Sequence, residues 1–67
     1  MSVKGILKQA CETGDFVRIT TDRLIYEEAT VTSLNDEMVD FNAMHLVKNI
    51  NYDFSIPLST IETVEFE

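Results

Sequence analysis

The spacing of the apolar residues changes once along this chain, close to Gly14. Before that point, apolar side chains recur three or four positions apart, as on one face of a helix: Val3, Ile6, Leu7, Ala10 and Cys11. Ser2 is a suitable N-cap, and Gly14 stands where a helix often ends in the left-handed conformation. From Asp15 onward apolar and polar residues alternate, which is typical of strands. We therefore expect a helix over residues 2–12 and β-structure over residues 15–66.

Turn residues divide the β-region into five short strands. Asp22–Arg23 and Asn35–Glu37 are turn candidates because Asp and Asn accept local backbone hydrogen bonds. Pro57 ends a strand and begins a single turn of 3₁₀ type through Thr60. The segment 45–49 either continues the third strand or turns it. The predicted strands cover residues 16–20, 24–34, 38–44, 51–56 and 61–66.

The alternation within residues 24–34 fails at Glu27–Glu28. Ala29 and Val31 share one phase, whereas Tyr26 has the opposite phase. One extra residue reconciles the two phases, so the pattern predicts a β-bulge or a sharp bend at this place.

The size of the chain limits how its strands can be arranged. Five short strands do not make a stable flat sheet in 67 residues, and curling the sheet on itself removes most of its edges. We expect one domain over residues 1–67: a mostly β fold, namely an SH3-like, five-stranded, strongly bent antiparallel barrel with a short N-terminal α-helix.

A core this small needs a source of stability in addition to its own apolar contacts. A chain of this length buries only about 60% of the surface that its unfolded form exposes. One cysteine and one histidine provide neither an internal disulfide nor a zinc-ligand set. We expect no metal and no cofactor, and oligomerisation is the reinforcement that remains.

The net charge of −7, from twelve acidic and five basic residues, makes the chain strongly acidic. Phosphate backbones are not attracted to it globally, so any nucleic-acid binding is expected to be local and salt-sensitive. Lys4 and Lys8 interrupt the apolar residues near the start, which argues against a signal peptide. No apolar run is long enough to span a bilayer. We expect a soluble, cytoplasmic protein with no membrane partner.

The sequence places no nucleophile, acid or base close to a partner residue that could activate it for catalysis. Ser–His or Cys–His chemistry needs partners within hydrogen-bond reach, and His45 has none nearby in the sequence. Cys11 lies on the apolar face of the predicted helix, where a thiol is inert. We expect no enzymatic activity and no small-molecule substrate.

The fourth and fifth predicted strands, 51–56 and 61–66, are rich in β-forming residues and lack Lys and Arg. Such strands invite pairing with another chain when they lie at the edge of a sheet. We expect a homo-oligomer, and the alternative is a monomer whose edges are shielded by Asp53, Glu62 and Glu65. The candidate interface residues are Tyr52, Phe54, Ile56, Ile61, Val64 and Phe66.

Three residues are candidates for contact with single-stranded RNA. Lys4 and Lys8 lie four positions apart on one face of the predicted helix, and a ring would repeat this pair into a basic rim. The alternative for both is a solvated helix face. Tyr26 offers a ring on which a base can stack, although aromatic side chains in so small a domain more often fill the core.

Two segments resemble the Sm-like family of small β-barrels, including its bacterial Hfq branch. Residues 30–38 (TVTSLNDEM) are similar to the end of the second strand and the turn after it, where an acidic or amide residue, here Asn35, stands three positions before a Met. Residues 56–64 (IPLSTIETV) are similar to strand four, its one-turn link and strand five. The resemblance covers residues 3–66. It implies a ring in which strand four pairs with strand five of the next subunit, and RNA binding through the two turns, hence Asn35.

The chain departs from the family pattern at the positions that bind RNA. Val39 stands where Sm proteins have the Asn of the base pocket, and Glu37 replaces an aromatic residue or His two positions earlier. Residues 57–59 replace the Arg-Gly or Tyr-Lys-His of the second turn, and Ala29 replaces the glycine of strand two. Two functions therefore remain open: a ring-forming, RNA-associated scaffold, and a protein-interaction or assembly module of the same fold without RNA binding.

Overall fold

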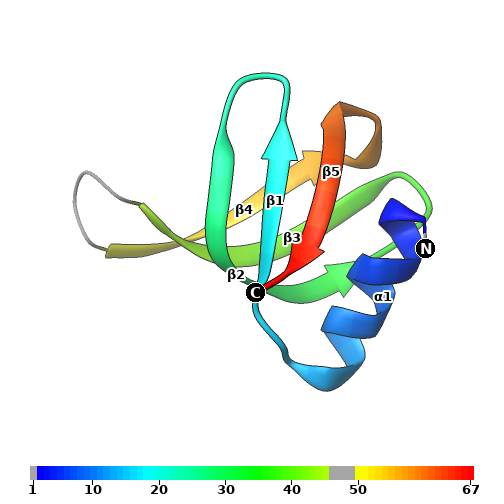
Figure 1. Ribbon diagram of the computed structural model, residues 1–67, viewed down its shortest axis with the longest axis horizontal. Helices are drawn as coiled ribbons and strands as arrows, with labels where there is room; N and C mark the ends of the chain where they lie inside the picture. The colour runs from blue at the N-terminus through cyan, green and yellow to red at the C-terminus, as the bar shows by residue number, and fades with distance from the viewer. Residues whose placement is uncertain (1, 46–49) are drawn as a thin grey trace.

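The computed structural model describes residues 2–45 and 50–67, and it shows one helix followed by an antiparallel sheet (Figure 1). The strands stand in the order β4-β3-β2-β1-β5. The predicted strands agree with the observed ones to within one residue at each end. The elements are α1 (Val3–Thr13), β1 (Val17–Thr21), β2 (Ile25–Leu34), β3 (Met38–His45), β4 (Ile50–Pro57), the 3₁₀ turn η1 (Leu58–Thr60) and β5 (Ile61–Phe66).

Helix α1 matches the predicted range, 2–12, to within one residue at each end, and its caps are the predicted Ser2 and Gly14. The Ser2 hydroxyl accepts a hydrogen bond of 3.0 Å from the Gly5 N–H. Gly14 has a φ of 77°, and its N–H donates to the Ala10 carbonyl at 2.8 Å. This conformation suits glycine because the residue has no Cβ. The helix packs against β2 and β5 and buries Leu7 and Ala10 completely.

Strand β2 bends at the predicted bulge, and it pairs with β1 along one edge and with β3 along the other. Val17 of β1 pairs with Ala29, whereas Ile19 pairs with Tyr26, so two steps along β1 match three steps along β2. Glu28 has a φ of 53°, the left-handed conformation that an extra residue in a strand can adopt. The prediction of an irregularity at Glu27–Glu28 is confirmed.

The predicted closure into a barrel is wrong, because the sheet remains open between β4 and β5. These two strands form the opposite edges of the sheet, and the chain passes from one to the other through η1 alone. Pro57, at the end of β4, has no N–H to give to a ladder. Ile56, Leu58 and Ile61 instead pack against the core from this link and its flanks. Apolar side chains thus cover the core where the ladder is missing.

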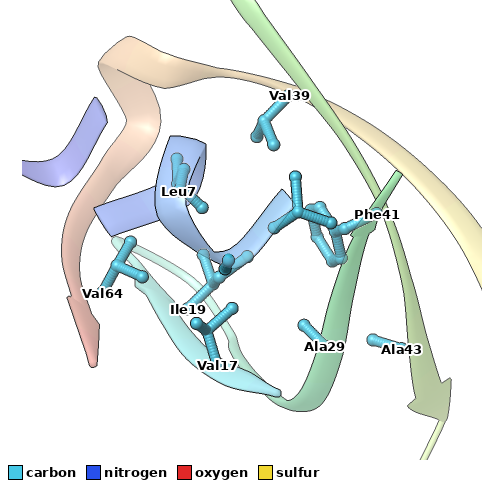
Figure 2. Close-up of a cluster of buried hydrophobic side chains, with 10 residues drawn as sticks. Leu7, Val17, Ile19, Ala29, Val39, Phe41, Ala43 and Val64 are labelled. Carbon is cyan, nitrogen blue, oxygen red and sulfur yellow. The ribbon is translucent and has the colours of Figure 1, made fainter. Parts of the chain in front are cut away.

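The core lies between the helix and the concave side of the bent sheet (Figure 2). Alternate residues of β3 point into it, as predicted, whereas Asp40 faces solvent. The Phe41 ring contacts two further rings, with centroid distances of 5.0 Å to Tyr26 and 5.5 Å to Phe54. Within the predicted 45–49 segment, His45 ends β3, and residues 46–49 lie outside the described residues. The buried residues are Leu7, Ala10, Val17, Ile19, Ala29, Val31, Val39, Phe41, Ala43 and Val64.

Candidate functional site

The outer edge of β4 has no ladder partner among the described strands. The Leu58 N–H, just past the end of β4, donates to the Glu37 carbonyl at 2.8 Å, so the backbone of residue 58 faces β3. Backbone groups alternate in direction along an extended strand. Ser55 and Asp53 therefore direct their N–H and C=O groups away from β3, toward the open side.

The outer edge of β5 is open in the same way. The Glu67 N–H donates to the Phe16 carbonyl at 3.1 Å, which places the backbone of residue 67 on the β1 side. By the same alternation, Phe66 and Val64 direct their backbone groups to the open side. No described strand pairs there. Two unsatisfied edges thus stand at opposite ends of one sheet, which is the arrangement that accepts additional strands.

The predicted interface residues differ in how far their side chains reach solvent. Phe66 and Tyr52 are 40% and 39% exposed, and both belong to the edge strands. Phe54, Ile56 and Ile61 are half-buried and pack against the core. The side chain of Val64 is buried, so this residue offers only its backbone to a partner.

A hollow that the sequence analysis did not identify lies between the β1–β2 turn and the end of β4. One side is formed by residues 21–24 and Tyr26, the other by Ile56, Pro57 and Thr60. We call it the hairpin hollow. Leu24, in its lining, and the adjacent Ile25 are 57% and 56% exposed, the largest exposures of any large apolar residues in the described chain. The sequence feature that could have revealed this surface is the pair of consecutive apolar residues, Leu24 and Ile25, directly after the predicted turn.

The turn that presents Leu24 is held by Thr21. The Thr21 hydroxyl accepts hydrogen bonds from the N–H groups of Leu24, at 3.0 Å, and Arg23, at 3.3 Å. The Thr21 N–H donates to the Leu24 carbonyl at 2.9 Å. The exposed apolar residues and the Arg23 side chain are therefore displayed by an ordered turn.

Three of the four candidate RNA-contacting residues lie around one hollow, beside α1. Lys4, Lys8 and Asn35 line it together with Cys11, Leu34 and two acidic residues, Glu12 and Asp36. Tyr26 lies elsewhere, in the three-ring cluster, where its ring centroid is 4.9 Å from that of Phe54. We call the hollow lined by Lys4, Lys8 and Asn35 the helix hollow. Its residues come from α1 and, far away in the sequence, from the end of β2 and the β2–β3 turn.

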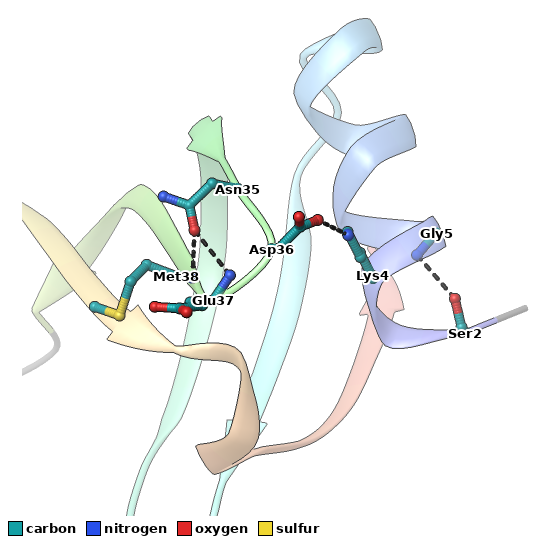
Figure 3. Close-up of polar contacts among 7 residues, drawn as sticks. All are labelled: Ser2, Lys4, Gly5, Asn35, Asp36, Glu37 and Met38. Carbon is teal, nitrogen blue, oxygen red and sulfur yellow. Dashed lines mark hydrogen bonds and ion pairs between the residues drawn. The ribbon is translucent and has the colours of Figure 1, made fainter.

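Lys4 and Asn35 both take part in contacts within the chain (Figure 3). Lys4 donates a hydrogen bond to the Asp36 carboxylate. This hydrogen bond, and then the positive charge of Lys4, lower the pKa of the Asp36 carboxyl below its usual value. The Asn35 side-chain oxygen accepts from the N–H groups of Glu37 and Met38, both at 2.8 Å. Lys8 forms no ion pair with any described residue.

A third hollow, at the bend of β2, is acidic. Arg18 and Glu27 form an ion pair of 3.4 Å there, and Glu65 lies directly across from Arg18 on β5. The Glu67 carboxylate accepts from the Glu28 N–H at 3.1 Å and ties the end of the chain to the bulge. This surface has more acidic than basic side chains, so it offers nothing to a phosphate.

The described residues contain no group of three or more His, Cys, Asp or Glu side chains arranged to hold a metal ion. Among the described helices, none has the length and apolar character needed to cross a membrane. Comparisons with protein-family models, with curated proteins and with solved structures found no match, so the likeness of two segments to the Sm-like family stays a prediction.

Proposed function

We propose that this chain is a non-catalytic module that assembles with copies of itself, by pairing the β4 edge of one copy with the β5 edge of the next. The observation that supports this most directly is the open sheet, whose two edge strands have backbone groups without ladder partners. One edge would satisfy the other because each has alternating donors and acceptors. Two different surfaces meeting in this way form a heterologous contact, which generates a ring when the rotation closes.

The side chains beside the edges support the same proposal. Phe66 and Tyr52 are exposed on the edge strands, and the exposed Leu24 lies in a hollow that includes the last residues of β4. Burying such apolar surface against a neighbour stabilises an assembly. The resemblance to the Sm-like family implies the same pairing of strand four with strand five.

Measurement of the mass in solution tests the proposal. Native mass spectrometry and light scattering at micromolar concentration should report a single oligomer rather than the 7.6 kDa monomer. Ser55→Pro removes an N–H that points to the open side, and an edge strand tolerates proline at such a position. We expect this variant to be folded and monomeric. A monomeric wild-type chain at this concentration contradicts the proposal.

The matched control replaces the same residue without touching the backbone. Ser55→Ala keeps the N–H and removes only an exposed hydroxyl, so it should assemble like the wild type. If both Ser55 variants assemble equally well, the β4 edge is not the contact surface, and the oligomer must form through another face.

RNA binding in the helix hollow is a second candidate, favoured by the meeting of Lys4, Lys8 and Asn35. Titration with oligo-U and oligo-A at low and moderate salt tests it. Binding that weakens with salt and disappears in a Lys4→Ala/Lys8→Ala double variant favours the scaffold that associates with RNA. The Lys8→Arg variant, which keeps the charge, should bind like the wild type. Absence of binding at low salt leaves the assembly module without RNA.

A further inference from the structure

The edge strands contain negative charges only. Residues 50–67 include four acidic residues and no Lys or Arg: Asp53, Glu62, Glu65 and Glu67. Pairing β4 with β5 of a second copy brings these acids together, and like charges that face each other across an interface weaken it. A stable contact between copies therefore needs a cation from another element.

Arg23 is the described cation best placed to supply that charge. Lys4 and Arg18 are already paired with Asp36 and Glu27 of their own chain. Lys8 lies on α1, in the helix hollow. Arg23 is exposed and forms no ion pair with any residue that the structure describes.

The position of Arg23 places it beside the end of β4. It lines the hairpin hollow together with Ile56 and Pro57, the last two residues of that strand. The Thr21 hydroxyl accepts a hydrogen bond from the Arg23 N–H and so orders the turn that carries the Arg23 side chain. A strand that pairs with the end of β4 is therefore placed next to the hollow that Arg23 lines.

An antiparallel neighbour would bring Glu62 to this place. All four ladders of the sheet are antiparallel. In an antiparallel β4–β5 contact the last residues of β4 lie beside the first residues of the neighbour's β5. Thr20 pairs with Thr63 and Thr21 with Ile61, so Glu62 is the extra residue of a bulge. Its side chain is exposed and forms no ion pair with a described residue.

We propose that Arg23 of one copy binds Glu62 of the next copy and thereby determines the register of the contact. The inference rests on the proposed assembly through β4 and β5 and names its specificity residue. A slip of two residues along the ladder moves Glu62 by about 7 Å and breaks the pair. The pair thus selects one register among those that the backbone alone would accept.

Charge reversal at each residue tests the pair. Arg23→Glu and Glu62→Arg should each weaken self-association by about tenfold or more, because each places like charges together. The two variants change the net charge in opposite directions, so a shared effect does not come from net charge. Arg23→Lys keeps the positive charge and should assemble nearly as well as the wild type. Both residues are exposed, so circular dichroism spectra should be unchanged.

Mixing the two singly reversed proteins distinguishes a contact between copies from one within a chain. In an alternating assembly, Glu at position 23 meets Arg at position 62, and the next junction is the native pair. The equimolar mixture should therefore assemble when neither protein does so alone, as measured by native mass spectrometry.

Three results overturn the inference, and they are distinguishable. A mixture that stays dissociated, while the Arg23→Glu/Glu62→Arg double variant assembles, shows a pair within one chain. An Arg23→Glu variant that assembles normally, while Ser55→Pro is monomeric, leaves the proposed function standing and removes only the role of Arg23. A monomeric wild type removes both.

Discussion

At one end of the molecule helix α1 packs against β2 and β5, whereas the β1–β2 turn projects at another end (Figure 1). Leu7 and Ala10 of the helix are fully buried, but Leu24 and Ile25, which follow the turn, remain more than half exposed. We call these two ends the covered end and the hairpin end. At the covered end, the chain uses its own helix to remove apolar surface from water. At the hairpin end, no described element covers the β1–β2 turn. The difference indicates that this chain covers its core with its own helix at one end and leaves apolar side chains exposed at the other.

Replacing a leucine at each end gives the sharpest test of this comparison. Leu7 is fully buried, and Leu7→Ala should lower the free energy of unfolding by about 2–5 kcal/mol, through lost transfer energy and the cavity left behind. Leu24→Ala should change it by less than about 0.5 kcal/mol, because this side chain is mostly in water already. Urea denaturation of dissociated protein measures both. Equal losses at the two ends would remove the distinction between them.

Leu24, which is expected to contribute little to folding, should contribute to self-association. If a neighbouring copy covers Leu24, its truncation removes about 1 kcal/mol of apolar burial from the contact, or roughly a fivefold increase in Kd. Sedimentation equilibrium measures this change. The exposed Gln9 lies on α1, away from the hairpin hollow, and Gln9→Ala serves as the control that should leave Kd unchanged. An unchanged Kd in Leu24→Ala would mean that the partner docks elsewhere.

Asn35 tests whether the β2–β3 turn at the covered end is held by its own side chain. Asn35→Ala removes the oxygen that accepts from the Glu37 and Met38 N–H groups and should cost about 1 kcal/mol of stability. Asn35→Asp keeps an accepting oxygen and should be less harmful. Thermal unfolding of the two variants compares them. If alanine and aspartate destabilise equally, the hydrogen bonds to this oxygen do not hold the turn.

The smallest expected effect concerns the ion pair between the helix and the β2–β3 turn. Lys4 lowers the pKa of Asp36 in the folded state, so the pair stabilises the fold above the unfolded carboxyl pKa, near 3.8. That contribution is lost as the pH falls through the lower, folded pKa. Wild type should therefore be slightly more stable than Asp36→Asn at pH 7, and the difference should vanish in strong acid. Both groups are exposed, so salt should also reduce it.

An NMR titration of the Asp36 carboxyl provides the control for this pair. In Lys4→Ala the pKa of Asp36 should rise toward its usual value, since both the hydrogen bond and the charge are removed. A pKa that stays low in that variant would mean that another group is responsible.

Local features of this chain were predictable because their causes lie within a few residues. Ser2 and Gly14 mark the ends of the helix through hydrogen bonds to residues three and four positions away. The bulge at Glu27–Glu28 appears in the sequence as a change in the phase of alternation, and Pro57 marks the end of β4 because proline cannot donate to a ladder. None of these signals depends on the remainder of the fold.

The contacts between distant residues were not predictable in the same way. Lys4 was a candidate for phosphate, but the fold brings Asp36 to it across 32 residues. Leu24 was assigned to a strand, and its exposure depends on what lies over the β1–β2 turn. The barrel was expected to close because a small sheet avoids open edges. The structure leaves the sheet open, with β4 and β5 at its two borders.

The sequence alone determined the helix, the five strands, the bulge and the inward face of β3, because periodicity and capping act over one or two turns of chain. Only the tertiary structure decided that β4 and β5 remain unpaired, that Lys4 meets Asp36, and that Arg23 lies beside the end of β4. These facts depend on how the bend in the sheet positions its edge strands and turns relative to one another and to the helix. That arrangement results from packing the whole core, and no short stretch of residues encodes it.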